Sequence, residues 1–130
     1  MNPNEIQIGG MHYRSDYQHW DYVREGLDGR YLEGCVTKYV YRWRKKNGLE
    51  DLRKAMHYLS KLMEAYSKRT LSPLGKSEFR HRSARMFVAA NDLKGYEEVI
   101  VMNLAEWSDK SVLLKTQQAL LELIEEEIAK

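Results

Sequence analysis

A run of basic residues in the first half of the chain has the residue types and spacing to bind phosphate. Residues 38–46, KYVYRWRKK, contain five cations and no acid. On a helix, Lys38, Arg42 and Lys45 would fall within about 60° of one another, on the side opposite the apolar residues. Arginine contacts phosphate oxygens in bidentate fashion and lysine contacts them as a point charge. The alternative interpretation is an ordinary solvent-exposed helix face.

A second set of polar residues follows the helix-breaking pair Asn47-Gly48. Asp51, Lys54 and Tyr58 are spaced i, i+3 and i+7, which places them along one side of a helix. In a hairpin of two helices this side can face the basic column. A carboxylate there can orient a cation or hold a metal ion, and a lysine can meet a phosphate oxygen. The alternative for Asp51 is a structural salt bridge between helices.

Apolar residues recur at helical spacing along most of the chain, and turn signals separate the segments. The first half is predicted to hold a short helix over 19–27 and a hairpin of two long helices over 30–46 and 49–69. A linker over 70–76 contains a proline and a glycine. Three further helical segments are expected after it, at 77–91, 96–107 and 109–129. The β-branched stretch at 98–102 leaves a short strand open as an alternative.

The predicted fold class is therefore all-α, a helical hairpin module plus C-terminal helices that together form a small helical bundle. We divide the chain into the basic hairpin module, residues 1–69, and a C-terminal helical region of unassigned function, residues 70–130. No internal repeat is evident. The first 70 residues carry an excess of four positive charges, whereas the rest carry an excess of two negative charges.

Composition excludes several classes of protein. No apolar run reaches the roughly 20 residues that a membrane-spanning helix needs, and the first residues do not resemble a secretion signal. The single cysteine, Cys35, cannot form an internal disulfide. We therefore expect a cytoplasmic protein. Nine tyrosines, three tryptophans and six methionines predict a homo-oligomer, because such residues are enriched at interfaces.

Motifs between residues 9 and 65 resemble a family of small bacteriophage proteins, most of them of unknown function. The family pattern runs GG-x-HY, Q-P-W-D, G-N-x-x-K-Y-x-x-R-x-x-x-K-x-G and E-D-L-x-K-A-x-x-Y-L. This chain matches it at Gly9-Gly10, His12-Tyr13, Gln18 to Asp21, Gly34, Lys38-Tyr39, Arg42, Lys46, Gly48 to Ala55 and Tyr58-Leu59. His19 stands in place of the usual proline and Cys35 in place of the usual asparagine. One member, from short-tailed coliphages, is a nucleoside monophosphate kinase that lacks a P-loop.

The resemblance implies a nucleotide site on the hairpin and, if the chain is a kinase, phosphoryl transfer. That reaction needs positive charge around the transferred group, usually with Mg²⁺, and in-line positioning of donor and acceptor. The residues assigned to catalysis are Lys38, Arg42, Asp51 and Lys54. Those assigned to ligand binding are His12, Tyr13, Trp20, Gly34, Tyr39, Lys46 and Tyr58. Asp51 and Glu50 are assigned to Mg²⁺, and the expected ligand is ATP or another nucleotide.

Three functions remain open, all of them in the cytoplasm of an infected bacterial host. The first is a P-loop-independent nucleoside monophosphate kinase. The second is a non-catalytic protein that sequesters a nucleotide signal of host defence. The third is a nucleic-acid or host-protein binder that uses residues 42–46, which the isoelectric point of about 8.6 disfavours because dedicated nucleic-acid domains usually exceed 9.

Two other motifs are weaker. Gly75-Lys76-Ser77 is not the end of a P-loop, because Thr70 stands where the first glycine is required. The acidic pairs Glu106/Asp109 and Glu122/Glu125 are similar to those of all-α nucleotide pyrophosphohydrolases, but their order is reversed.

Overall fold

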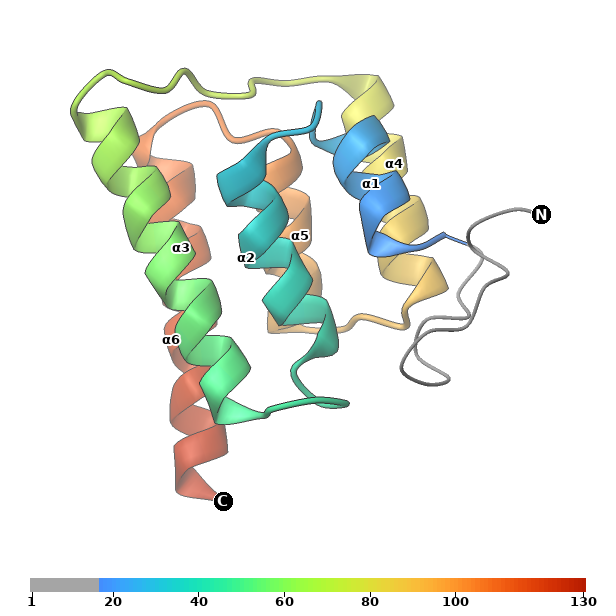
Figure 1. Cartoon of the computed structure of the whole chain (residues 1–130), viewed down its shortest axis with the longest axis vertical. Helices are drawn as coiled ribbons and strands as arrows, with labels where there is room; N and C mark the ends of the chain where they lie inside the picture. The colour runs from blue at the N-terminus through green and yellow to red at the C-terminus, as the bar shows by residue number, and fades with distance from the viewer. Residues whose placement is uncertain (1–16) are drawn as a thin grey trace.

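The computed structural model describes residues 17–130, which form six α-helices in two layers (Figure 1). The front layer holds α1 (His19–Gly26), α2 (Tyr31–Arg42) and α3 (Leu49–Ser67), and the rear layer holds α4 (Glu78–Ala90), α5 (Tyr96–Ala105) and α6 (Lys110–Ala129). The prediction of an all-α bundle is confirmed. The strand alternative for 98–102 is wrong, because this segment lies within α5. In the described part of the chain, no helix has the length and apolar character needed to span a membrane.

The segment between α2 and α3 is a turn, although the apolar pattern predicts a helix to residue 46. Residues 43–48 are non-helical, and the amide of Gly48 donates to the carbonyl of Trp43 at 2.9 Å. Gly48 has a φ of +56°, a left-handed conformation that favours glycine. Lys45 therefore does not continue the column formed by Lys38 and Arg42.

Two apolar clusters hold the layers together, and each draws residues from both halves of the chain. The larger joins α2, α3, α5 and α6 through fully buried residues that include Val40, Leu59, Leu104 and Leu120. The smaller lies between α1 and α4, where the rings of Tyr22 and Phe87 stack with centroids 4.5 Å apart. The hairpin module thus covers its apolar face with the C-terminal helices.

The two layers are related by an approximate two-fold rotation. α1 packs on α4, α2 on α5 and α3 on α6, and the members of each pair run in opposite directions (Figure 1). Glu33, near the start of α2, accepts a hydrogen bond from Trp107 Nε1 at 2.8 Å. Reciprocally, Glu97, near the start of α5, accepts one from Trp43 Nε1 at 2.8 Å. The spacing from Glu33 to Trp43 equals that from Glu97 to Trp107.

The same alignment of the two halves extends into α3 and α6. Leu52, Ala55 and Leu59 of α3 are buried, and so are the residues at the equivalent positions of α6, Thr116, Ala119 and Leu123. The bundle is therefore a repeat of one three-helix unit, which the sequence hides because few residues are identical between the halves.

Candidate functional site

Arg42 and Asp51 form a salt bridge between α2 and α3. Arg42 Nε and Nη2 donate to the two carboxylate oxygens of Asp51 at 3.3 and 3.4 Å, and the amide of Asn47 donates to the same carboxylate at 3.3 Å. The Asp51 side chain is fully buried and that of Arg42 is 17% exposed. The salt-bridge alternative for Asp51 is therefore what the structure shows. The placement of Arg42 opposite the core is wrong, because the carboxylate draws the guanidinium against α3.

The ring of Tyr39 is the centre of a basic and aromatic cluster. Arg42 Cζ lies 4.8 Å from the ring centroid, Lys38 Nζ 5.5 Å and Lys54 Nζ 5.6 Å. Cations within about 6 Å of a ring centroid are attracted to its face, which offsets part of their mutual repulsion. The ring of Tyr58 lies nearly parallel to that of Tyr39, with centroids 6.0 Å apart. The fold thus brings five predicted site residues together; we call them the Tyr39 cluster.

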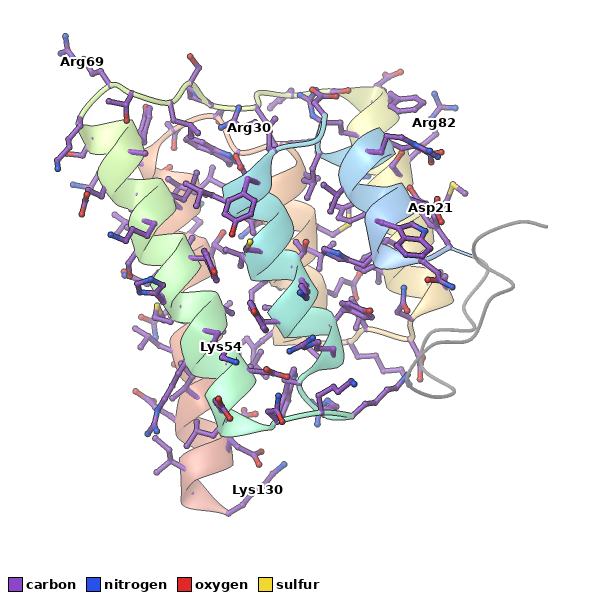
Figure 2. The ribbon with its side chains drawn as sticks, in the orientation of Figure 1. Asp21, Arg30, Lys54, Arg69, Arg82 and Lys130 are labelled. Atoms are coloured by element: carbon purple, nitrogen blue, oxygen red, sulfur yellow. The ribbon has the colours of Figure 1, made fainter. Side chains whose placement is uncertain are left out.

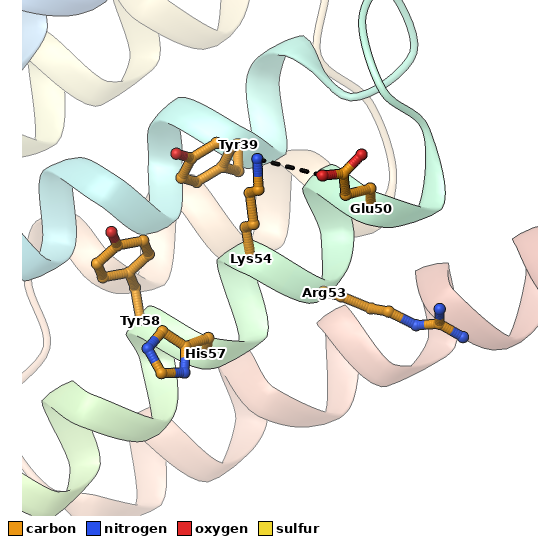
Figure 3. A pocket seen from close by; sticks show the side chains of 6 residues that line it. All are labelled: Tyr39, Glu50, Arg53, Lys54, His57 and Tyr58. Carbon is orange, nitrogen blue, oxygen red and sulfur yellow. Dashed lines mark ion pairs between the residues drawn. The ribbon is translucent and has the colours of Figure 1, made fainter.

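An open pocket of about 400 Å³ borders the Tyr39 cluster (Figure 3). This volume lies toward the lower end of the range of about 300–1,000 Å³ that is typical of small-molecule sites. The pocket is lined by Tyr39, Glu50, Arg53, Lys54, His57 and Tyr58. The motifs do not point to Arg53 and His57; only their helical spacing next to Lys54 and Tyr58 could have indicated them.

Within the pocket, Lys54 is the cation best placed to meet a ligand. Figure 3 shows its ammonium between Tyr39 and Glu50, whereas the Arg53 side chain extends away from both tyrosine rings. Lys54 projects from α3 toward α2 (Figure 2) and pairs with Glu50 at 3.5 Å. Because Glu50 is exposed, this pair contributes at most about 1 kcal/mol, so a phosphate can replace the carboxylate at little cost.

The aromatic surface continues from the pocket to the start of α2. Tyr31 is exposed and meets Tyr58 edge to face, with centroids 6.1 Å apart. Hydrogen bonding with Cys35 and Tyr58 raises the pKa of Tyr31 to about 12. The Tyr31 hydroxyl therefore stays protonated at neutral pH and is engaged with these two neighbours.

Other predicted site residues lie away from the pocket or outside the described residues. His12 and Tyr13 belong to the part of the chain that the structure does not describe. Trp20 is on α1 and Lys46 is in the α2–α3 turn, and neither lines the pocket. The space beside Gly34 is filled by α1, because a Cβ built there would lie 3.2 Å from Val23 Cγ2.

The carboxylates assigned to Mg²⁺ have different surroundings. Asp51 is buried against Arg42 and the Asn47 amide, so its oxygens are already paired. Glu50 is exposed at the pocket rim. Between residues 17 and 130, no group of three or more His, Cys, Asp or Glu side chains is arranged to hold a metal ion. Of these two carboxylates, Glu50 is the one that could offer accessible oxygens to an ion carried by a ligand.

His19 joins α1 to α2 through Thr37 and Tyr41. Its ring stacks on that of Tyr41, with centroids 5.3 Å apart, and its Nε2 lies 2.9 Å from Thr37 Oγ1. Burial, and then the positive charges of Lys38 and Arg42, lower the pKa of His19 to about 4. His19 is therefore neutral at pH 7.

Acidification is expected to destabilise the protein through His19. The pKa is lower in the folded chain than in the unfolded one, so the unfolded chain binds more protons between about pH 6.5 and about pH 4. The free energy of unfolding should fall through this window by on the order of 3 kcal/mol, at about 1.4 kcal/mol per pKa unit. Urea titrations at a series of pH values should show that the free energy of unfolding of His19→Gln falls less with decreasing pH than that of the wild type. Equal slopes for the two proteins would contradict this assignment.

The two-fold relation provides an internal comparison for the Tyr39 cluster. The positions equivalent to Tyr39, Lys54 and Tyr58 in the second half hold Asn103, Gln118 and Glu122. The second half folds into the same three-helix arrangement without tyrosine or cation at these three places. The fold itself therefore does not require these side chains.

Comparison with known proteins agrees with the extent of the motifs. A family model described as a protein of unknown function (DUF3310) matches residues 9–60. No curated protein and no solved structure matches the chain significantly. The matched span includes α1, α2, the first part of α3 and every residue that lines the pocket. The part of the chain that carries the Tyr39 cluster is thus similar to a family whose function is not known.

Proposed function

We propose that this protein binds a nucleotide at the Tyr39 cluster. The observation that supports the proposal best is the Tyr39 ring, which has three cations within 6 Å and lies beside Tyr58 in an open pocket. A nucleobase can stack on a tyrosine face, which contributes about 1–3 kcal/mol per base. The phosphates would then meet Lys38 and Lys54. The site combines the two kinds of group that a nucleotide needs.

The roles of the cations differ. Arg42 is held by the buried Asp51, so we assign it to positioning: it fixes α2 against α3 and adds positive potential beneath the ring. Lys38 is exposed and Lys54 has only the exposed Glu50 as an ionic partner among the described residues. These two lysines are the groups that contact phosphate in the proposal.

The enzymatic form of the proposal is a nucleoside monophosphate kinase without a P-loop, which rests on the resemblance to the bacteriophage family. In that form ATP is the donor, and Mg²⁺ arrives with its phosphates, as is usual for this ion. Glu50 is the carboxylate at the rim that would face it. Without turnover, the same site would sequester a nucleotide signal in the cytoplasm of an infected host.

The third possibility, a nucleic-acid binder, uses the exposed residues Arg44 and Lys45 of the turn between α2 and α3. It is less favoured, because the only aromatic residue of this turn, Trp43, is buried, whereas Tyr39 and Tyr58 line the pocket. We also propose that the protein is a homo-oligomer, as its aromatic and methionine content suggests.

A ligand screen by thermal unfolding tests the proposal. We expect nucleotides to raise the unfolding temperature, because a ligand at 100 times its dissociation constant adds about 2.7 kcal/mol to the free energy of unfolding. Mono-, di-, tri- and cyclic nucleotides should be compared with the free nucleoside and with inorganic phosphate. The nucleoside presents only the base and sugar to the site, and inorganic phosphate presents only the anion. Stabilisation by single-stranded oligonucleotides alone, with steep salt dependence, would indicate the nucleic-acid function instead.

Any ligand that binds should then be incubated with ATP and Mg²⁺. Formation of a nucleoside diphosphate and ADP would establish the kinase. Tight binding without product would establish sequestration. If no nucleotide stabilises the protein, the proposal fails.

A further inference from the structure

The outer face of α6 carries an exposed apolar stripe. Leu114, Leu121 and Ile128 are 45%, 37% and 60% exposed. They are spaced seven residues apart, so they lie along one face of the helix, as the seam residues of paired helices do. Within residues 17–130, no other helix covers this stripe. Its apolar surface is left in contact with water.

The fold does not require apolar residues at these positions. Under the two-fold relation, the equivalents of Leu114, Leu121 and Ile128 are Glu50, His57 and Glu64 on α3. All three are polar, and α3 forms a regular helix with them. Polar residues therefore suit this face of the repeat, and the stripe on α6 calls for a separate explanation.

Apart from Asp109 at the N-cap and Lys130 at the C-cap, the charges of α6 are arranged against its own dipole. Lys110 and Lys115 lie in its first half, whereas Glu125 and Glu126 lie near its C-terminal end. A helix is stabilised by acids at its N-terminus and bases at its C-terminus, and α3 follows this order with acids in its first turn. In an antiparallel pair of α6 helices, the lysine end of one would lie beside the glutamate end of the other.

The C-terminal end of α6 also extends past the rest of the bundle. Figure 1 shows its last turns beyond the start of α3, with no other helix beside them. Ile128, the most exposed residue of the stripe, lies on this extension. A partner helix would cover it.

We infer that α6 is a homodimer interface, in which it packs antiparallel against α6 of a second copy. A two-fold axis at Leu121 places Leu114 opposite Ile128 of the partner subunit, because both lie seven residues from the axis. The same register brings Lys115 beside the acidic end of the partner helix. A parallel pair would instead place like charges together. This inference specifies the surface of the proposed oligomer and is independent of nucleotide binding.

Light scattering after size-exclusion chromatography tests the interface. We expect a mass twice the monomer's 15.4 kDa at micromolar concentration. Leu121→Glu should raise the dimer dissociation constant at least about 100-fold, because it places two carboxylates together at the axis. The matched control is His57→Glu, which adds the same charge at the equivalent position of α3 and should leave the dimer intact. A monomeric wild-type protein, or equal effects of the two variants, would overturn the inference.

Cysteine cross-linking tests the direction of the pairing without relying on a destabilised variant. In a Cys35→Ser background, Leu121→Cys should form an intermolecular disulfide with itself, since residues at a two-fold axis approach closely. Leu114→Cys should cross-link with Ile128→Cys in a mixture of the two proteins, and neither should cross-link alone. Self-cross-linking of Leu114→Cys would indicate a parallel pair and contradict the register. Capture of a helix from another protein in place of self-association would also overturn it.

Discussion

Glu33→Ala is expected to lower the free energy of unfolding by about 3–5 kcal/mol, the range for breaking one partner out of a buried ion pair. Glu33 is fully buried and accepts the indole N–H of Trp107 at 2.8 Å. It also pairs with Arg30 at 2.9 Å. Without the carboxylate, the buried Trp107 N–H loses its acceptor, and the largely buried Arg30 guanidinium loses its counter-charge and keeps only the carbonyl of Ser72, at 2.8 Å. Urea denaturation followed by tryptophan fluorescence and circular dichroism measures the change.

The two-fold relation supplies a matched control in Glu97→Ala. Glu97 accepts the indole N–H of Trp43 at 2.8 Å and pairs with Arg44 at 3.2 Å. The Arg44 side chain is 56% exposed, compared with 23% for Arg30, so water can solvate Arg44 when its partner is removed. We expect a smaller loss for Glu97→Ala, about 1–3 kcal/mol, the cost of an unsatisfied buried donor. If Glu97→Ala lowered the free energy of unfolding more than Glu33→Ala, burial of the paired guanidinium would not determine the size of the loss.

The second large effect is expected in ligand binding and depends on the proposed function. The double variant Lys38→Ala/Lys54→Ala should weaken nucleotide binding by about 100-fold or more. Each lysine supplies a charge-assisted hydrogen bond worth about 1.5–3 kcal/mol, and every 1.4 kcal/mol is a factor of ten in affinity. Fold stability should change little, because Lys38 is exposed and the Lys54–Glu50 pair is at the surface. Isothermal titration calorimetry measures the affinity.

The control for this experiment is Lys61→Ala/Lys68→Ala. Both residues are exposed on α3 outside the pocket, so this variant removes the same net charge without touching the Tyr39 cluster. Its affinity for the nucleotide should stay within about twofold of wild type at 0.15 M salt, where exposed charges more than about 8 Å apart are screened. Equal losses in the two double variants would mean that only the overall charge of the protein matters.

The elements of this fold and four of the six residues that line its pocket could be predicted locally. Apolar spacing and turn pairs such as Asn47-Gly48 placed all six helices to within a few residues, because helix formation depends on contacts three and four residues apart. The same spacing set Lys54 and Tyr58 on one side of α3. Once α2 and α3 form a hairpin, these residues and Tyr39 must lie close together.

Contacts between residues of different helices could not be predicted from local spacing. Spacing left Asp51 either as a ligand or as part of a salt bridge, and only the packing of α3 on α2 buried it against Arg42. Gly34 likewise has its packing role because α1 lies on α2. The end of α2 was predicted too late in the chain, because α2 ends at Arg42 and the residues from Trp43 to Gly48 form the turn. The partner of the Trp43 indole, Glu97, belongs to the other half and could not be predicted from local spacing either.

The two-fold relation of the layers was decided by tertiary structure alone. Glu33 and Trp107 are far apart in sequence, as are Glu97 and Trp43, and nothing in local spacing pairs them. Sequence determined which segments are helical and which faces are apolar, since both follow from neighbours along the chain. The pairing of apolar faces depends on the free energy of packing the whole bundle. The pairing of each buried carboxylate with an indole depends on the same free energy. That free energy includes contacts between residues that local periodicity cannot relate.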